Sequence, residues 1–199
     1  MTAMAVRRDR RTERHERTKA EIVQAAWTLA DERGLAGWSL RDVAEAVGMR
    51  APSLYVYVES KNDLYDALFA DGYRALVERL AAIDRSADPV ETLRRGTREF
   101  VAFCVERPPR HTLLFLRTLP GFEPSAESYA LAQQVLAGTV DVLAAAGIRG
   151  SGSVDLYTAM VSGLVTQQLS NDPGGDRWTR LVDDALDLLL AGRRSRRRR

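Results

Sequence analysis

Apolar residues recur along this chain every three or four positions, the spacing of amphipathic helices, and no segment alternates every second position as a strand would. Over residues 13–33 this stripe predicts a long helix, and Gly34 follows at a position where glycine commonly ends one. Prolines and glycines fall between the later apolar segments, where they mark the connections between helices. The pattern therefore predicts an all-α protein.

Two short helices are expected next. Ser39, with Asp42 three residues later, forms a variant of the capping box that begins a helix. Gly48 makes a tight turn, and Pro52 suits the first turn of a second short helix over residues 52–58, because its missing N–H has no helical partner there. Two short helices joined by a glycine turn are typical of a helix-turn-helix, whose second helix enters the major groove of DNA.

The rest of the chain predicts a larger helical region. Ser60 begins a helix that extends to about residue 83, and the prolines at 108 and 109 are expected to break a later one. Further helices are expected over residues 89–106, 111–119, 125–146, 153–170 and 176–191. The expected organisation is a disordered basic arm over 1–13, a helix-turn-helix domain over 14–62, a second helical domain over 63–192 and a disordered arginine tail over 193–199.

The charge of the chain is small but unevenly distributed. The net charge of the 199 residues is +2. Residues 1–61 carry 11 Lys/Arg against 9 Asp/Glu, residues 62–192 carry 12 against 18, and residues 193–199 add six arginines. An acidic body with basic ends confines any nucleic-acid surface to one end of the molecule.

The sequence offers little support for other classes of function. The one cysteine, Cys104, cannot form an internal disulfide, which favours a reducing cytoplasm, and we expect a small buried side chain rather than a redox sensor. Cys104 and the two histidines lack metal-ligand spacing, so no metal or other cofactor is predicted. The absence of a nucleophile elbow and of a glycine-rich phosphate loop argues against an enzyme, and no apolar stretch has the length of a membrane span.

Three runs resemble the DNA-binding domain of the TetR family of transcriptional repressors. They are Ser39–Met49, Ala51–Val58 and Ser60–Leu64, within a match that spans about residues 17–69. The resemblance implies a set of DNA-binding residues: Ser39, Arg41, Arg50, Ala51, Pro52, Ser53, Tyr55, Tyr57 and Lys61.

The resemblance also implies a role for each of these residues. Ser39, Tyr55 and Lys61 match positions that contact phosphates, Tyr57 matches one that usually touches the DNA backbone, and the others match positions at or near base edges. The methyl group of Ala51 can meet only a thymine methyl, so Arg41 and Arg50 are expected to carry more of the readout, through guanine O6 and N7. Two alternatives stay open: the tyrosines could belong to the core, and the arginines at both ends could be solvated tails or additional DNA contacts.

The resemblance further implies that residues 63–192 dimerise and bind a small effector. Pairing of the last two helices across a two-fold axis is expected through Tyr157, Val161, Leu164, Val165, Trp178, Leu181, Val182, Leu186 and Leu189. The candidate pocket residues are Phe100, Phe103, Cys104, His111, Leu114, Phe115, Tyr129, Gln133, Met160 and Gln167, and their apolar character suits a hydrophobic or amphipathic effector. Either set could instead pack within one subunit.

Taken together, these features predict a cytoplasmic, homodimeric regulator of transcription. Its partner is double-stranded operator DNA, and we expect a repressor that a small, largely apolar ligand releases from that DNA. The alternatives are an activator, or a helical ligand-binding or architectural protein of the same fold without sequence-specific DNA recognition.

Overall fold

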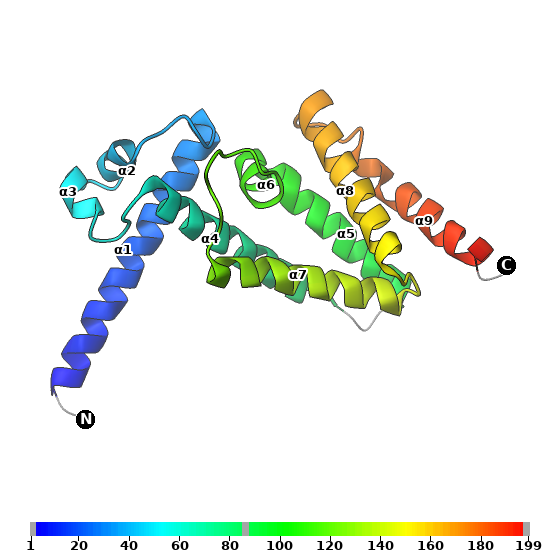
Figure 1. The fold of residues 1–199 in the computed structure, drawn as a ribbon, viewed down its shortest axis with the longest axis horizontal. Helices are drawn as coiled ribbons and strands as arrows, with labels where there is room; N and C mark the ends of the chain where they lie inside the picture. Colours follow the sequence, from blue (N-terminus) through cyan, green and yellow to red (C-terminus); the bar gives the residue numbers. More distant parts are fainter. Residues whose placement is uncertain (1–2, 85–87, 197–199) are drawn as a thin grey trace. The chain divides into compact units, whose positions relative to one another are not determined.

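The computed structural model describes residues 3–84 and 88–196, and these residues form helices without any strand (Figure 1). The helices are α1 (Ala3–Arg33), α2 (Leu40–Ala46), α3 (Ala51–Leu54), α4 (Lys61–Ala81), α5 (Pro89–Glu106), α6 (Pro108–Phe115), α7 (Ala126–Ala145), α8 (Ser151–Asn171), the 3₁₀ turn η1 (Thr179–Leu181) and α9 (Val182–Arg196). The predicted all-α class is confirmed. No helix among the described residues is long and apolar enough to cross a membrane.

The chain folds into two compact units, each described here by itself. The N-terminal unit contains residues 1–72 and 112–129, and the C-terminal unit contains residues 73–111 and 130–199. The helices α4, α6 and α7 begin in one unit and end in the other. The units therefore do not divide at the expected boundary between residues 62 and 63. Helix α4 continues across that boundary, and its backbone hydrogen bonds are uninterrupted there.

The first helix is longer than expected. Helix α1 begins at Ala3, whereas the sequence analysis expected disorder through residue 13. Residues 3–33 contain neither glycine nor proline and are rich in Ala, Arg and Glu, so nothing in their sequence stops the helix before Gly34. The side chains of residues 3–11 lie outside the described part of the chain, and so do those of the arginine tail, along with residues 197–199. The roles expected of both basic ends stay predictions.

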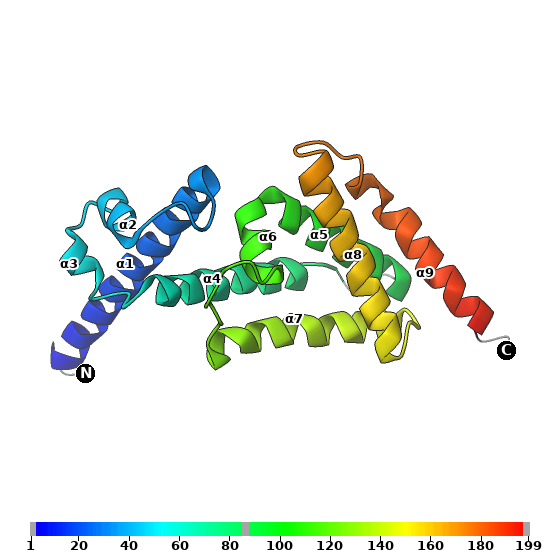
Figure 2. The same cartoon turned by 45° about the horizontal axis from the view of Figure 1, so that its top comes forward.

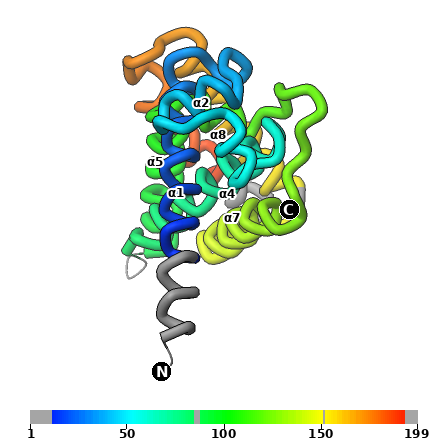
Figure 3. The backbone as a smooth tube through the Cα atoms, turned by 90° about the vertical axis from the view of Figure 1, so that its left-hand side faces the viewer, coloured from blue at the N-terminus to red at the C-terminus, as the bar shows by residue number. Residues whose placement is uncertain are grey.

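In the core of the N-terminal unit, α2 packs against both α1 and α3. Helix α2 lies across α1, as two views show (Figures 1 and 3). Ile22, Ala26 and Trp27 of α1 are fully buried or nearly so, and so are Val43 of α2 and Leu54 of α3. Burying these side chains contributes most of the stability of such a small unit, so the apolar stripes predicted from the sequence do face inward.

Both capping signals in this unit form as predicted. The Oγ of Ser39 accepts a hydrogen bond from the Asp42 N–H at 3.3 Å, and the Ser39 N–H donates to Asp42 Oδ2 at 2.7 Å, which completes the capping box. Ser60 Oγ likewise accepts from the Asp63 N–H at 3.1 Å at the start of α4. Helix α3 is shorter than expected and ends at Leu54, although turns continue toward Val58.

The first two turns of α4 also hold the segment that leads into α7. Asp66 accepts hydrogen bonds from the backbone N–H of Ser125 at 2.7 Å and from the hydroxyl of Ser128 at 2.8 Å. Asn62 Nδ2 donates to the Gly121 carbonyl at 3.2 Å, and Phe122 packs edge-on against Tyr65. The start of α7 therefore belongs to the same packed unit as the helix-turn-helix.

In the C-terminal unit, α8 and α9 pack against each other and against α5 (Figures 1 and 2). Phe103, Leu143, Val165 and Leu186 lie at the centre of this packing, each with almost no exposed surface. Arg98 of α5 forms an ion pair with Asp183 of α9 at 2.8 Å. The helices of this unit are thus joined by an apolar core with charged pairs at its edge.

Two features of the C-terminal unit differ from the sequence analysis or were missed by it. Helix α5 ends at Glu106, before Pro108 and Pro109, as expected, but the two prolines also begin α6, because proline needs no N–H partner in a first turn. The helix consequently spans residues 108–115 rather than 111–119. The buried side chain of Gln168 accepts from the backbone N–H of Trp178 at 2.9 Å and so holds the turn before α9.

Candidate nucleic-acid interface

The turn between α2 and α3 places one face of α3 in solvent. Gly48 has φ of +68°, a backbone conformation that side-chain-bearing residues rarely adopt, and this turn redirects the chain into α3. Val43 and Leu54 are fully buried between the helices, so they fix the mutual orientation of α2 and α3. The side chains on the opposite face of α3 are left exposed.

Most of the residues expected at DNA lie on this exposed surface. Ser39, Arg41, Arg50, Pro52 and Ser53 are exposed, and Ala51 is half-buried. Tyr55 has 54% of its surface exposed, which excludes the alternative that this tyrosine belongs to the core. Neither Arg41 nor Arg50 makes an ion pair among the described residues, so both guanidinium groups are available to an external partner.

The ring of Tyr57 is packed rather than free. It stacks on the imidazole of His15 in α1, with ring centroids 4.7 Å apart and planes inclined by 23°. Tyr57 is half-buried as a result. The sequence alone indicates no role for His15, because the contact joins residues far apart in the chain. The stack fixes the orientation of the tyrosine on the surface expected to meet DNA.

Lys61, expected at a phosphate, already has partners within the protein. Its Nζ donates to the carbonyl oxygens of Trp38 at 2.5 Å and of Ala36 at 3.3 Å. The ammonium also lies over the Trp38 ring, 4.4 Å from its centroid. Burial lowers the pKa of Lys61, while the negative charge of Asp42 acts in the opposite direction. The ammonium is therefore half-buried and bonded rather than projecting into solvent.

The capping box also fixes the electrostatics at the start of α2. Hydrogen bonds from the hydroxyl and the backbone N–H of Ser39 hold the pKa of the Asp42 carboxyl below its usual value, and Arg33 nearby acts in the same direction. Arg33 Nη1 lies 3.3 Å from Asp42 Oδ1. A charged Asp42 thus stabilises the helix start beside Arg41, where the surface is otherwise cationic.

Exposed hydroxyls and arginines on a short, firmly packed helix can bind a nucleic acid. Ser and Tyr hydroxyls are common partners of phosphates, and an arginine can donate two hydrogen bonds to guanine in the major groove. The structure places Arg41 on α2, Arg50 immediately before α3, and Ser53 and Tyr55 along and just after it. The chemistry expected from the sequence is therefore available on one surface.

The structure separates the candidate pocket residues by burial. Phe103, Cys104, His111 and Leu114 are buried, whereas Phe100, Phe115 and Met160 are half-buried. Tyr129, Gln133 and Gln167 are exposed. Burial raises the pKa of the Cys104 thiol to about 12 and lowers the pKa of His111. Cys104 is a core residue, as expected, and its thiol is in the unreactive protonated form at neutral pH.

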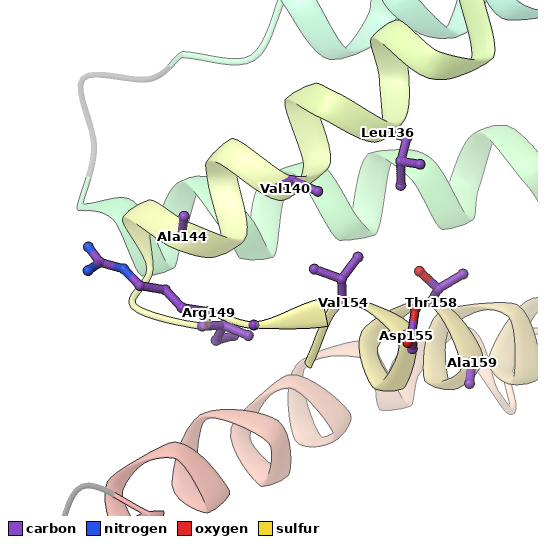
Figure 4. Close-up of a pocket in the computed structure, with 10 residues that line it drawn as sticks. Leu136, Val140, Ala144, Arg149, Val154, Asp155, Thr158 and Ala159 are labelled. Atoms are coloured by element: carbon purple, nitrogen blue, oxygen red, sulfur yellow. The ribbon is translucent and has the colours of Figure 1, made fainter. Parts of the chain in front are cut away.

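A groove lies between α7 and α8 in the C-terminal unit (Figure 4). Its volume is about 780 Å³. Leu136 and Val140 of α7 point toward Val154 and Thr158 of α8 across it (Figure 4). The lining is mostly apolar, with Arg149 and Asp155 among its polar residues. The ten candidate pocket residues are not among those that line this groove, because most of them belong to α5 and α6.

Five of the nine residues expected in a dimer interface are buried inside the protomer: Tyr157, Val161, Val165, Val182 and Leu186. Because these five side chains pack inward within one protomer, their expected contact with a partner subunit stays a prediction. Leu164, Trp178, Leu181 and Leu189 are half-buried. Sequence periodicity identifies an apolar helix face but cannot tell whether it packs within a subunit or between subunits.

Large apolar side chains are nevertheless exposed on the same two helices. Leu156 of α8 is 55% exposed and Leu188 of α9 is 78% exposed. Ala159 and Gly163 are exposed on the face of α8 that carries Leu156. Leu156 and Leu188 were not among the residues predicted from the sequence, since they lie outside the stronger apolar stripe.

Comparison with known proteins finds a family match over the helix-turn-helix. Residues 22–68 match the model of bacterial regulatory proteins of the tetR family. Over 143 residues, 68% of this chain, the sequence is 29% identical to the HTH-type transcriptional regulator Rv1816 of Mycobacterium tuberculosis. That match covers 60% of the relative, so the chain spans about three-fifths of its length.

The chain is also similar to a named repressor and to a solved structure. Over 76 residues, 38% of each chain, the sequence is 33% identical to the HTH-type transcriptional repressor KstR2 of Mycobacterium tuberculosis. The crystal structure of the transcriptional regulator FadR from Bacillus subtilis, in complex with stearoyl-CoA, is similar with a TM-score of 0.65. It is 19% identical, and the match covers 87% of this chain and 98% of that one, which establishes a common fold.

Proposed function

We propose that the chain is a member of the TetR family of bacterial regulatory proteins, whose model matches residues 22–68, and that it regulates transcription by binding double-stranded operator DNA. The observation that carries this proposal is the exposed surface of the helix-turn-helix. There, Arg41 and Arg50 make no ion pair with any described residue, and Tyr55 is solvent-exposed on helices whose apolar faces are fully buried. Because a regulator of this kind works beside the chromosome, the proposal includes a cytoplasmic location.

Within this proposal, the exposed residues divide by chemistry. Arg41 and Arg50 read base edges, with guanine as the favoured partner, and Ser53 lies at the groove edge. Ser39, Tyr55 and Tyr57 bind phosphates and set the register of the helix on the duplex. Lys61 is not included in this phosphate-binding set, because its ammonium is already hydrogen-bonded within the protein.

The proposed regulator acts as a homodimer. One short recognition helix makes few contacts, whereas two helices related by a two-fold axis can enter successive major grooves. We propose an interface through the exposed face of α8 and α9, centred on Leu156 and Leu188. The small residues Ala159 and Gly163 on this face let two helix backbones approach closely.

We further propose that a small, largely apolar ligand releases the protein from its operator. The groove between α7 and α8 offers apolar walls of a size suited to such a molecule. The fold relative FadR was crystallised with stearoyl-CoA, and KstR2 is named a repressor, which supports a ligand-released repressor. Release requires that the ligand bind the DNA-free state more tightly than the DNA-bound state.

A gel-shift experiment with DNA from upstream of the chain's own gene tests this function. The protein should shift this DNA in the presence of a large excess of bulk competitor DNA. Arg50→Ala should weaken the preference for this DNA over the competitor, while Arg177→Ala, which removes an exposed arginine from the C-terminal unit, should retain it in full. If bulk competitor DNA removes the shift of the unaltered protein completely, the proposal is contradicted.

A further inference from the structure

The first turns of α4 bind the loop that leads into the helix-turn-helix. This α1–α2 loop comprises residues 34–39 and has no regular secondary structure of its own before α2. Two side chains of α4, Lys61 and Tyr65, reach three of its carbonyl oxygens. We call these contacts the loop clasp.

The loop clasp consists of short and partly charged hydrogen bonds. Lys61 Nζ donates to the Trp38 carbonyl at 2.5 Å and to the Ala36 carbonyl at 3.3 Å. The Tyr65 hydroxyl donates to the Leu35 carbonyl at 2.6 Å. Hydrogen bonds from a charged donor are roughly twice as strong as neutral ones, so Lys61 contributes the stronger part of the clasp.

Aromatic packing lies beside these bonds, of which the Tyr65 bond is buried and the Lys61 bond to Trp38 is partly buried. The indole of Trp38 is buried beneath the Lys61 ammonium, and the Tyr65 ring meets it edge-on, with centroids 5.4 Å apart. The ammonium also lies 5.4 Å from the centroid of the Tyr65 ring. A cation held over aromatic faces and bonded to carbonyls has little freedom to turn toward a DNA phosphate.

The backbone of the loop follows a tight course between α1 and α2. At Gly37 it passes so close to the end of α1 that a β-carbon would collide with the carbonyl oxygen of Arg33. The residue after Trp38 is Ser39, whose hydroxyl caps α2. A loop held at Leu35, Ala36 and Trp38 therefore fixes the point at which α2 begins, and α2 in turn braces α3.

We propose that Lys61 is a positioning residue for DNA recognition, acting with Tyr65 through the α1–α2 loop rather than as a ligand of a DNA phosphate. This inference rests on the proposed DNA-binding function. Releasing the loop lowers the fraction of molecules whose α2 and α3 are arranged for binding, and the apparent affinity falls by that fraction. The loss is the same at every salt concentration, since no phosphate contact and no counterion release are involved.

The salt dependence of operator binding separates the two roles of Lys61. Lys61→Met keeps the length of the side chain but removes its charge and both hydrogen bonds. If Lys61 positions the loop, this variant binds the operator about tenfold more weakly at every salt concentration, because the competent fraction falls to about a tenth. The slope of log K against log salt stays that of the unaltered protein. Removal of a phosphate ligand would instead lower that slope by about 0.9 for each phosphate that is no longer neutralised.

Two variants serve as matched controls. Tyr65→Phe removes the other half of the clasp without changing any charge, and it should weaken operator binding about threefold, also with an unchanged slope. The double variant should lose less than the product of the two single effects, since both act through one loop. Arg41→Ala removes an exposed cation beside the proposed DNA surface and should lower the slope, which shows that the assay responds to the removal of one cation.

Amide hydrogen exchange measures the clasp without DNA. In Lys61→Met the amides of residues 35–44 should exchange faster than in the unaltered protein, while those of the C-terminal unit keep their rates. Faster exchange with an unchanged salt slope supports the proposal. An unchanged exchange rate, or a slope that falls by about one per recognition domain, overturns it. If the unaltered protein binds no operator, the proposed function fails, and the exchange measurement alone still decides the role of Lys61 in the loop.

Discussion

The two units of this protein relate differently to their sequences. In the N-terminal unit, local signals determine the site: a capping box, a glycine turn and a second cap place α2, α3 and α4 within a few residues of their expected positions. In the C-terminal unit, apolar periodicity identified the helices but did not show which neighbours each helix face packs against. The difference shows that caps and turns specify local geometry, whereas burial depends on elements far away in the chain.

The largest expected effect compares two leucines on one helix of the C-terminal unit. Leu186 is fully buried, while Leu188 is 78% exposed. Leu186→Ala should lower the free energy of unfolding by about 2–5 kcal/mol, because it leaves a cavity in the core. Leu188→Ala should leave the unfolding of an isolated protomer nearly unchanged. Denaturant titrations at low protein concentration would check this, and equal losses in the two variants would contradict the assignment of their faces.

The next effect concerns the surface of the N-terminal unit. Arg50→Ala should cost about 1–3 kcal/mol of discrimination between the preferred base and the others. The unfolding free energy should not change, since Arg50 is exposed and makes no ion pair among the described residues. Binding titrations with single-base variants of the operator measure this discrimination. An unchanged preference would remove Arg50 from the base-reading set.

A smaller effect sharpens the dimer proposal for the C-terminal unit. Leu188→Ala should weaken self-association by about 1–2 kcal/mol, because truncation removes part of an apolar side chain that a partner would bury. Sedimentation at several concentrations measures it. Arg95→Ala, on an exposed part of α5, is the control. If Leu188→Ala dimerises as strongly as the unaltered protein, the face centred on Leu188 is not part of the dimer interface.

The smallest effect tests the cap of α2. Ser39→Ala should lower the free energy of unfolding by about 1 kcal/mol at neutral pH. The Ser39 hydrogen bonds lower the pKa of Asp42 in the folded state, so the stability from its charge is present above the unfolded pKa and is lost as the pH falls through the folded value. The difference in melting temperature between the unaltered protein and Ser39→Ala should therefore shrink below about pH 4. A difference that stays constant down to about pH 2 would contradict the capping-box account.

The sequence predicted the parts of the site that depend on neighbours in the chain. Ser39 with Asp42, and the buried Val43 and Leu54, follow from spacing, whereas the exposure of Tyr55 was expected from the family resemblance. The stack of His15 on Tyr57 could not be predicted, because it joins residues 42 positions apart. The engagement of Lys61 depends on how a loop without regular structure folds back on α4.

In the C-terminal unit, the sequence could not show which apolar faces are buried within the protomer. Tyr157, Val161 and Val165 form a strong apolar stripe, and an apolar stripe packs wherever it buries the most surface, which here is inside the protomer. The weaker face with Leu156 and Leu188 gave no signal above the background of scattered surface leucines. At Pro108 and Pro109 the sequence predicted the end of α5 but not the start of α6, since the same prolines are compatible with the first turn of a new helix.

Selection of bound sequences from random double-stranded DNA tests most directly whether the surface around Arg41, Arg50 and Tyr55 reads an operator. We expect the unaltered protein to enrich a single two-fold symmetric sequence, with half-sites separated by about one helical turn or a multiple of it. We expect Arg50→Ala to lose the preference at one position in each half-site. Recovery of DNA without any enriched sequence, at salt concentrations where the protein is folded, would contradict the account.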